Sequence, residues 1–308
     1  LVWIGDMHPE TISVLRLFGD DPSIRRSLDY IRDETELPSW MNGIPSYSMW
    51  WCKIQCDLYR YTGDREYLAR QLPYVKQLCG LLTNCVKSDG TVDIDYKFID
   101  WPSSAQPSAQ ALGVRSLLAV SLSSCLGILH VFGDDSCDEQ IEKALKALSE
   151  YPPEKSDNKQ AVALAVFAGL ISAKQAEEEI LSKDPLSGLS TFLCYYVMQA
   201  RAKAGAMRGA LDIIRKYYGA MLELGATTMW EDFDLEWAKN AKPLDALLGD
   251  GEYDVHGDNG GYCYKGYRHS LCHGWAAGTV SFATEYILGI KVAEVGCEKI
   301  TISPDLGD

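Results

Sequence analysis

The sequence is poor in positive charge. Its 308 residues include 29 Lys and Arg against 43 Asp and Glu, which gives a formal net charge of −14. Proteins that bind nucleic acid usually present a basic face that neutralises phosphates. An acidic surface repels that polyanion, so the charge balance argues against a nucleic-acid partner. A neutral ligand such as a sugar is compatible with it.

CxxC motifs and long uninterrupted apolar runs are also missing. The ten cysteines include no CxxC pair, and their share lies far below that of a disulfide scaffold. We therefore expect most of them to be small, buried, apolar residues. The most apolar stretch, residues 111–132, contains Arg115 and several serines. It predicts a buried core helix, and we expect no membrane span.

Helical periodicity dominates the rest of the chain. Asp21-Pro22 and Asp64 stand where helices start, and Gly63 and Gly133 stand where a left-handed residue ends a last turn. The pattern predicts helices over residues 9–18, 22–34, 46–61, 64–86, 107–132, 137–149, 158–168, 173–182, 187–204, 206–224, 233–247 and 272–288.

Twelve successive helices predict an all-α fold. Antiparallel neighbours can close into a double ring, whose inner helices are apolar on nearly every face, as 107–132 and 272–288 are. We therefore expect an (α/α)6 barrel over residues 1–290, with long loops and a pocket at one rim. No fixed-period repeat supports the alternative, an irregular solenoid. The final run, CEKITISPDLGD, resembles a strand for which the sequence offers no partner.

Two long loops, residues 88–106 and 248–271, combine acidic and aromatic side chains. Long irregular loops in a compact domain are usually functional or disordered, and their aromatic content argues against disorder. The second loop holds Tyr253, His256, Tyr262, Tyr264 and Tyr267.

Tryptophans stand beside acids at several loop–helix boundaries. The pairs are Trp3 near Asp6, Asp100 with Trp101, and Trp230 with Glu231 and Asp232, while Trp50 and Trp51 follow another loop. Indoles cover the C–H faces of sugars, and carboxylates bind their hydroxyls. The alternative is that the tryptophans are core residues and the acids cap helices. Because every pair falls at such a boundary, we favour a carbohydrate site.

Glu231 is the best candidate for acid–base chemistry. Glycoside hydrolysis needs two carboxyl groups, and an inverting enzyme holds them about 6.5–9.5 Å apart so that a water fits between. Apolar Trp230 and acidic Asp232 flank Glu231, and such neighbours raise a carboxyl pKa. The alternative is a cap on the helix predicted from residue 233. His273, beside Gly274, could donate to a sugar hydroxyl or be a core histidine.

Four segments occur in a recognisable order: LVWIGDMHPE, YKFIDWP, TTMWEDF and HSLCHGWAAGTVSFATEYILG. Together they resemble the family-78 glycoside hydrolases, the α-L-rhamnosidases, over nearly the whole chain. The resemblance implies an (α/α)6 catalytic domain, inversion of the anomeric carbon, a carbohydrate substrate and no cofactor. It also implies that residues 291–308 begin a C-terminal β-sandwich, with further domains of the same parent chain as partners.

The resemblance also implies roles for individual residues. Glu231 matches the general base, Trp3 and Asp6 match a sugar-contacting pair, Trp101 after Asp100 matches a pocket wall, and His273 matches a pocket histidine. The family's proton donor precedes the WxGD motif and would fall before Leu1. Two departures concern substrate choice: Ser46 to Met49 stand where the family has an Asp-containing loop, and Cys272-His273-Gly274-Trp275 stands where it has Asn-His followed by an aromatic.

Three other interpretations remain open. Cys263, His269, Cys272 and His273 could hold zinc, but their spacing is irregular, and we predict no metal site. Asp134, Asp135 and Asp138 resemble the DDxxD string of a terpene cyclase, although acids that open a helix are equally expected as caps. Finally, the domain could bind glycans without cleaving them, in which case the aromatic pocket would survive and the acid pair would not.

Overall fold

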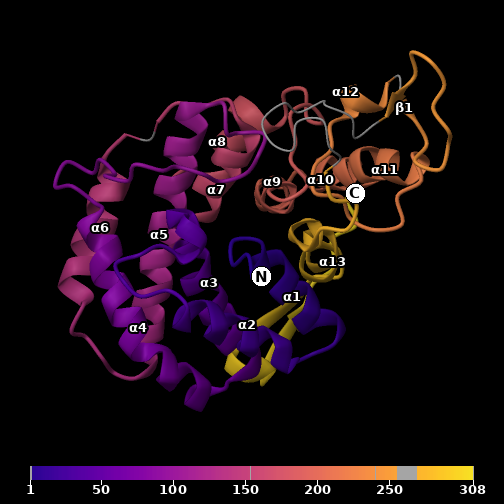
Figure 1. Cartoon of the computed structure of the whole chain (residues 1–308). Coiled ribbons are helices and arrows are strands. Elements are labelled where there is room, and N and C mark those ends of the chain that lie inside the picture. The colour runs from indigo at the N-terminus through magenta and orange to yellow at the C-terminus, as the bar shows by residue number, and fades with distance from the viewer. Residues whose placement is uncertain (1, 153, 240, 255–268, 308) are drawn as a thin grey trace.

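Six inner helices form a ring in the computed structural model, which describes residues 2–152, 154–239, 241–254 and 269–307 (Figure 1). Each inner helix contacts the next, and the last contacts the first. They are α1 (Met7–Leu17), α3 (Pro45–Thr62), α5 (Pro107–Val131), α7 (Lys159–Phe167), α9 (Cys194–Lys203) and α13 (Gly278–Phe282), which η5 (Ala283–Ile287) continues.

The helices between them in sequence cover the outside of this ring. They are α2 (Pro22–Asp33), α4 (Arg65–Asn84), α6 (Asp138–Glu150), α8 (Ala173–Ala176) with η2 (Glu177–Leu181), and α10 (Met207–Ile213) with η3 (Ile214–Tyr218) and α11 (Gly219–Glu223). The alternation of inner and outer helices confirms the predicted all-α toroid of the (α/α)6 barrel type. Asp21 and Asp64 cap α2 and α4 by accepting from backbone amides, as their sequence position predicts.

Helix α5 shows why an apolar run can remain inside a protein. It is long and apolar enough to cross a membrane, but 83% of its apolar window is buried within the toroid. Arg115, in the middle of this helix, donates to the carbonyl oxygens of Leu148 and Tyr151, which satisfies part of its buried guanidinium. The predicted core helix is thereby confirmed. Five cysteines are likewise buried, and the nine that the structure describes are free thiols.

The ring closes between its first and last inner helices. The Ser13 hydroxyl of α1 donates to the carbonyl of Ala277 at 2.9 Å and lies 3.1 Å from the hydroxyl of Ser281 in α13. Farther along the same pair, Arg16 Nη2 lies 2.8 Å from Glu285 Oε2. Two segments more than 260 residues apart are therefore joined, so the ring depends on both ends of the chain.

All inner helices run in the same direction because an outer helix returns the chain each time. The residues at their starts gather at one end of the ring, which we call the N-terminal mouth and define by Asp6, Tyr47 and His273. The residues in their last turns gather at the opposite end, the C-terminal mouth, defined by Arg16 and Glu285. The two mouths therefore carry different sets of side chains at opposite ends of the ring.

The prediction of a helix over 233–247 is wrong. Asp234 caps a single turn by accepting from the Glu236 amide at 2.8 Å, and α12 (Leu235–Ala238) ends there. Pro243 follows and lacks the amide hydrogen that a continuing helix needs. The segment instead forms β1 (Ala241–Lys242), which pairs with β2 (Tyr253–Asp254). Residues 255–268, which include His256, Tyr262, Tyr264 and Tyr267, lie outside the described residues.

The terminal strand does have a partner. Residues of the CEKITISPDLGD run form β4 (Lys299–Ile302), which pairs antiparallel with β3 (Ile290–Glu294), with Ile290 opposite Ile302. The two strands are joined through η6 (Val295–Cys297), which packs against α3. The sequence did not reveal this pairing, because β3 directly follows the last helix after Gly289 without a polar turn. The hairpin contacts α3 through η6 and β3, and its membership of a C-terminal β-sandwich stays a prediction.

Candidate functional site at the N-terminal mouth

Glu231 is held rigidly in the loop that precedes α12. Its carbonyl oxygen accepts from the Trp275 indole at 2.7 Å and from the Thr191 hydroxyl at 2.5 Å, and its amide donates to Ser270 O at 2.9 Å. The side chain, 2% exposed, accepts two N–H bonds. Oε1 receives the Trp101 indole at 3.2 Å, and Oε2 receives the Ser270 amide at 2.8 Å. These two donors fix the orientation of the carboxyl group.

His273 links this glutamate to the start of α1. Its Nε2 lies 3.0 Å from Asp6 Oδ2, and its Nδ1 lies 3.9 Å from Glu231 Oε2. The other oxygen of Asp6 accepts from the Tyr47 hydroxyl at 3.1 Å. One imidazole thus separates two carboxyl groups that are 225 positions apart in the sequence. The WIGD, IDWP, MWED and LCHGW segments all contribute to this cluster, which we call the His273 cluster.

The pKa of His273 reflects these neighbours. Burial lowers it, but the hydrogen bond to Asp6 and the charges of Asp6, Glu231 and Glu10 outweigh burial, so the pKa lies above its ordinary value of 6.5. The carboxyl groups on either side therefore favour the protonated form of the imidazole.

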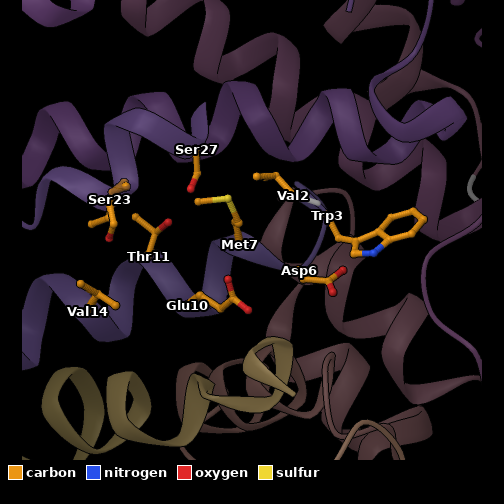
Figure 2. A pocket seen from close by; sticks show the side chains of 10 residues that line it. Val2, Trp3, Asp6, Met7, Glu10, Thr11, Val14, Ser23 and Ser27 are labelled. Atoms are coloured by element: carbon orange, nitrogen blue, oxygen red, sulfur yellow. The ribbon is translucent and has the colours of Figure 1, made fainter. Parts of the chain in front are cut away.

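A pocket of ≈ 290 Å³ adjoins the His273 cluster, between α1 and α2. Figure 2 shows Trp3 and Asp6 at one end of it and Glu10 on the α1 wall, with Ser23 and Ser27 opposite. The Trp3 indole is 47% exposed, so its face is accessible to a ligand. Hydroxyls, carboxyls and an indole around a small hollow are the combination that sugars require.

Glu10 is also a member of this pocket, although its place in the sequence predicts only a cap on the first helix. Burial, with a contribution from the charge of Asp6, raises its pKa to about 7, although His273 opposes the shift. A Cβ on Gly274 would lie 1.9 Å from Glu10 Oε1, so this carboxyl lies directly against the segment that carries His273. Its helical position looks like ordinary first-turn placement, which explains why the sequence pattern conceals it.

Three residues predicted to contact a sugar lie in the protein interior. Asp100 is fully buried, where it accepts from the amide of Ser103 at 2.9 Å. Trp50 stacks on His8 with ring centroids 5.0 Å apart, and Trp230 packs against Phe233 at 5.6 Å. Neither indole is more than 1% exposed. In the described structure these three side chains are enclosed by protein, and their contact with a sugar stays a prediction.

Buried carboxyls surround the site without entering the pocket. Burial raises the pKa of Asp232 well above its ordinary value, with Asp100 and Glu231 among the charges that add to the shift. Burial also raises the pKa of Asp100, against hydrogen bonds from Ser103 and Ser190. These raised pKa values favour the neutral form of Asp100 and of Asp232, which reduces the repulsion that three adjacent negative charges would produce.

The structure also bears on the competing interpretations. Among the described residues, no three His, Cys, Asp or Glu side chains are grouped as a metal site requires, and Cys263 lies outside those residues. Asp134 pairs with Lys76, and Asp138 lies 2.8 Å from His130 Nε2. Both acids are therefore engaged in ion pairs around the start of α6, where no side chain of the described residues caps the helix.

Solved structures share this architecture. The chain superposes on a GH78 family rhamnosidase of Bacillus sp. GL1 with a TM-score of 0.74 and 23% identity, over 100% of this chain and 34% of that one. An α-L-rhamnosidase from Dictyoglumus thermophilum gives 0.74 and 20% over 98% and 35%. A Streptomyces avermitilis α-L-rhamnosidase complexed with L-rhamnose gives 0.72 and 18% over 98% and 30%.

The chain has the fold of a segment of these rhamnosidases. It spans about a third of the length of each of these three solved chains. No protein-family model matches it, and no curated protein sequence does.

Proposed function

We propose that the protein is an inverting glycoside hydrolase that releases terminal α-L-rhamnose, with this domain as its catalytic part. The observation that carries the proposal is the His273 cluster, in which Glu231, Trp101, Asp6 and His273 meet at one mouth of the ring. The likeness to rhamnosidase structures, one of them complexed with L-rhamnose, supports the choice of sugar.

In this proposal Glu231 is the general base. A water held by its carboxylate attacks the anomeric carbon and gives its proton to Glu231 while the glycosidic C–O bond breaks on the opposite face. The Trp101 indole and the Ser270 amide orient the carboxylate, so little reorganisation is needed when the proton moves. The leaving oxygen takes a proton from a donor that the family resemblance places before Leu1.

The remaining residues bind the sugar or position those that do. Trp3 offers an exposed indole face, and Asp6 offers a carboxylate to the sugar hydroxyls. His273 is a positioning residue that holds Asp6 at 3.0 Å. The hydrogen bond from Tyr47 fixes the other Asp6 oxygen. Further domains of the parent chain are proposed to flank this one.

The test is Glu231→Gln in the whole protein, assayed with p-nitrophenyl α-L-rhamnoside. Loss of a general base lowers kcat by about 10²–10⁴-fold, whereas the shape of the side chain is kept. Glu236→Gln is the matched control, because that carboxylate lies on the surface and pairs with Lys239. Proton NMR of the first-formed sugar should show β-L-rhamnose, the inverted anomer.

Several outcomes would reject parts of the proposal. Near wild-type turnover by Glu231→Gln would remove Glu231 as the base. An α-anomer as first product would exclude inversion. Saturable rhamnose binding by the wild type without any turnover would instead establish a glycan-binding module.

A further inference from the structure

A second pocket lies on the axis of the ring and opens at the C-terminal mouth. It has a volume of ≈ 300 Å³ and is bounded by α1, α3, α9, η5 and β3, with Phe167 at the end of α7. We call it the axial pocket. Five cationic side chains line it: Arg16, Lys53, Arg60, Lys203 and Lys291. Two carboxylates, Asp57 and Glu285, accompany them, in a chain whose formal net charge is −14.

The two carboxylates are already engaged. Asp57 Oδ1 lies 2.5 Å from Lys53 Nζ, and its Oδ2 lies 2.8 Å from His8 Nε2. A carboxylate can only accept, so His8 donates through Nε2 and accepts at Nδ1 from the Tyr196 hydroxyl, 2.6 Å away. Burial lowers the pKa of His8, which keeps this imidazole neutral. The floor of the pocket is therefore a satisfied network with no negative charge to spare.

Arg60, Lys203 and Lys291 lie at the entrance, and none of them has a carboxylate partner among the described residues. Glu285 pairs with Arg16 at 2.8 Å, and Arg60 donates to the carbonyl of Val292 at 2.6 Å. Lys203 and Lys291 face the aromatic rings of Phe167 and Tyr286 at 5.9 and 5.0 Å. Deeper inside, the side chain of Arg16 is 7% exposed, and its Nη1 has no well-formed hydrogen bond in the described part of the chain.

Helix polarity explains part of this arrangement. Arg16, Arg60 and Lys203 occupy the last turns of α1, α3 and α9, where cations complement the exposed carbonyls. That interaction does not require the three side chains to converge on one cavity, since each could extend to solvent. Convergence has a cost: burial lowers the pKa of Lys203, and the charges of Lys291 and Lys53 lower it further.

We infer that the axial pocket binds a small organic anion, one that carries a carboxylate or phosphate group next to an apolar or ring-shaped face. Lys203, Lys291 and Arg60 would receive the charged group, and Arg16 Nη1 would donate from the interior. Tyr286 and Phe167 supply the apolar walls. The volume is at the lower end of the range of small-molecule sites, so the ligand is of monosaccharide size. This inference stands independently of the hydrolase proposal, which concerns the opposite mouth.

Calorimetric titration of the purified chain at constant ionic strength tests the inference, with inorganic phosphate, D-glucuronate and neutral D-glucose as probes. Phosphate or glucuronate should bind saturably and raise the midpoint of thermal unfolding by about 3 °C at saturating concentration. Glucose should do neither. Binding of both anions identifies a general oxyanion site, and binding of one identifies its headgroup.

Matched double variants separate the pocket from general surface charge. Lys203→Met with Lys291→Met should weaken anion binding at least about tenfold, because two of the charged donors are lost. Lys146→Met with Lys174→Met removes the same charge from the exposed faces of α6 and α8 and should leave affinity unchanged. Absence of saturable binding by either anion, or equal losses in both double variants, would overturn the inference.

Discussion

At the scale of single residues, Glu10 shows how a pocket changes a common side chain. Burial and the charge of Asp6 raise its pKa from 4.5 to about 7, so the folded protein binds this proton more tightly than the unfolded chain does. As the pH rises from 4.5 to about 7, the unfolding free energy therefore falls. Above pH 7 the buried carboxylate is charged, and its full destabilising effect on the folded state is present.

Glu10→Gln should therefore stabilise the protein in alkaline but not in acidic solution. The shift of 4.5 to about 7 corresponds to about 3 kcal/mol of unfolding free energy. Urea unfolding at pH 8 should show most of this gain, and unfolding at pH 4 should show little. Glu36→Gln, at an exposed position, is the control. An equal effect of Glu10→Gln on the unfolding free energy at both pH values would contradict the raised pKa of Glu10.

At the scale of elements, Gly5 sets how closely the first two inner helices approach. A Cβ at this position would lie 2.1 Å from Tyr47 Cε1, so the ring of Tyr47 occupies space that any other residue would fill. The same tyrosine donates to Asp6. The glycine of the WIGD motif therefore supports the His273 cluster through packing.

Gly5→Ala should displace Tyr47 and weaken its bond to Asp6. Such overpacking costs about 1–3 kcal/mol of stability, and circular dichroism during thermal unfolding would measure it. In Gly80→Ala, the control, a Cβ in α4 meets nothing within 4 Å, and this change should be neutral or add about 1 kcal/mol. Equal stability of the two variants would show that Tyr47 moves aside freely.

Some helix boundaries follow directly from the sequence, and others do not. The boundary between α3 and α4 agrees closely with the prediction, because Gly63 ends α3 and Asp64 caps α4. The helix expected at 233–247 does not form, because apolar residues recur at helical spacing beyond the single turn that Asp234 caps. For the candidate site, adjacency of tryptophan and acid predicts Glu231 and Trp101, which lie in hydrogen-bond contact. It does not distinguish an indole at a mouth from one inside the ring, as Trp50 is.

Residues that meet only in three dimensions gave no sequence signal. The cations of the axial pocket come from four separate elements, and each one resembles an ordinary helix-end or strand charge. Tyr47 was noted only as a departure from the family pattern, yet it is bonded to Asp6. The order of the motifs predicts which segments meet. Residues that join them only through packing, as Tyr47 does, are evident only from the folded structure.

At the scale of the whole molecule, closure of the ring makes stability depend on its last helix. Without α13, the faces of α1 and α9 that contact it would be open to water. Deleting residues 274–308 should therefore abolish the cooperative urea transition seen by circular dichroism and tryptophan fluorescence. Deleting residues 306–308 should preserve it. A cooperative transition of unchanged steepness in the longer deletion would mean that an open ring is stable.

The common direction of the inner helices also gives the molecule an electrical polarity. Carboxyl groups occupy one end of the ring axis, and Arg60, Lys203 and Lys291 surround the opening at the other. On a negatively charged support at low salt, the protein should attach by its cationic end despite its overall acidity. Immobilised in that orientation, it would present Trp3 and Asp6 to the solution.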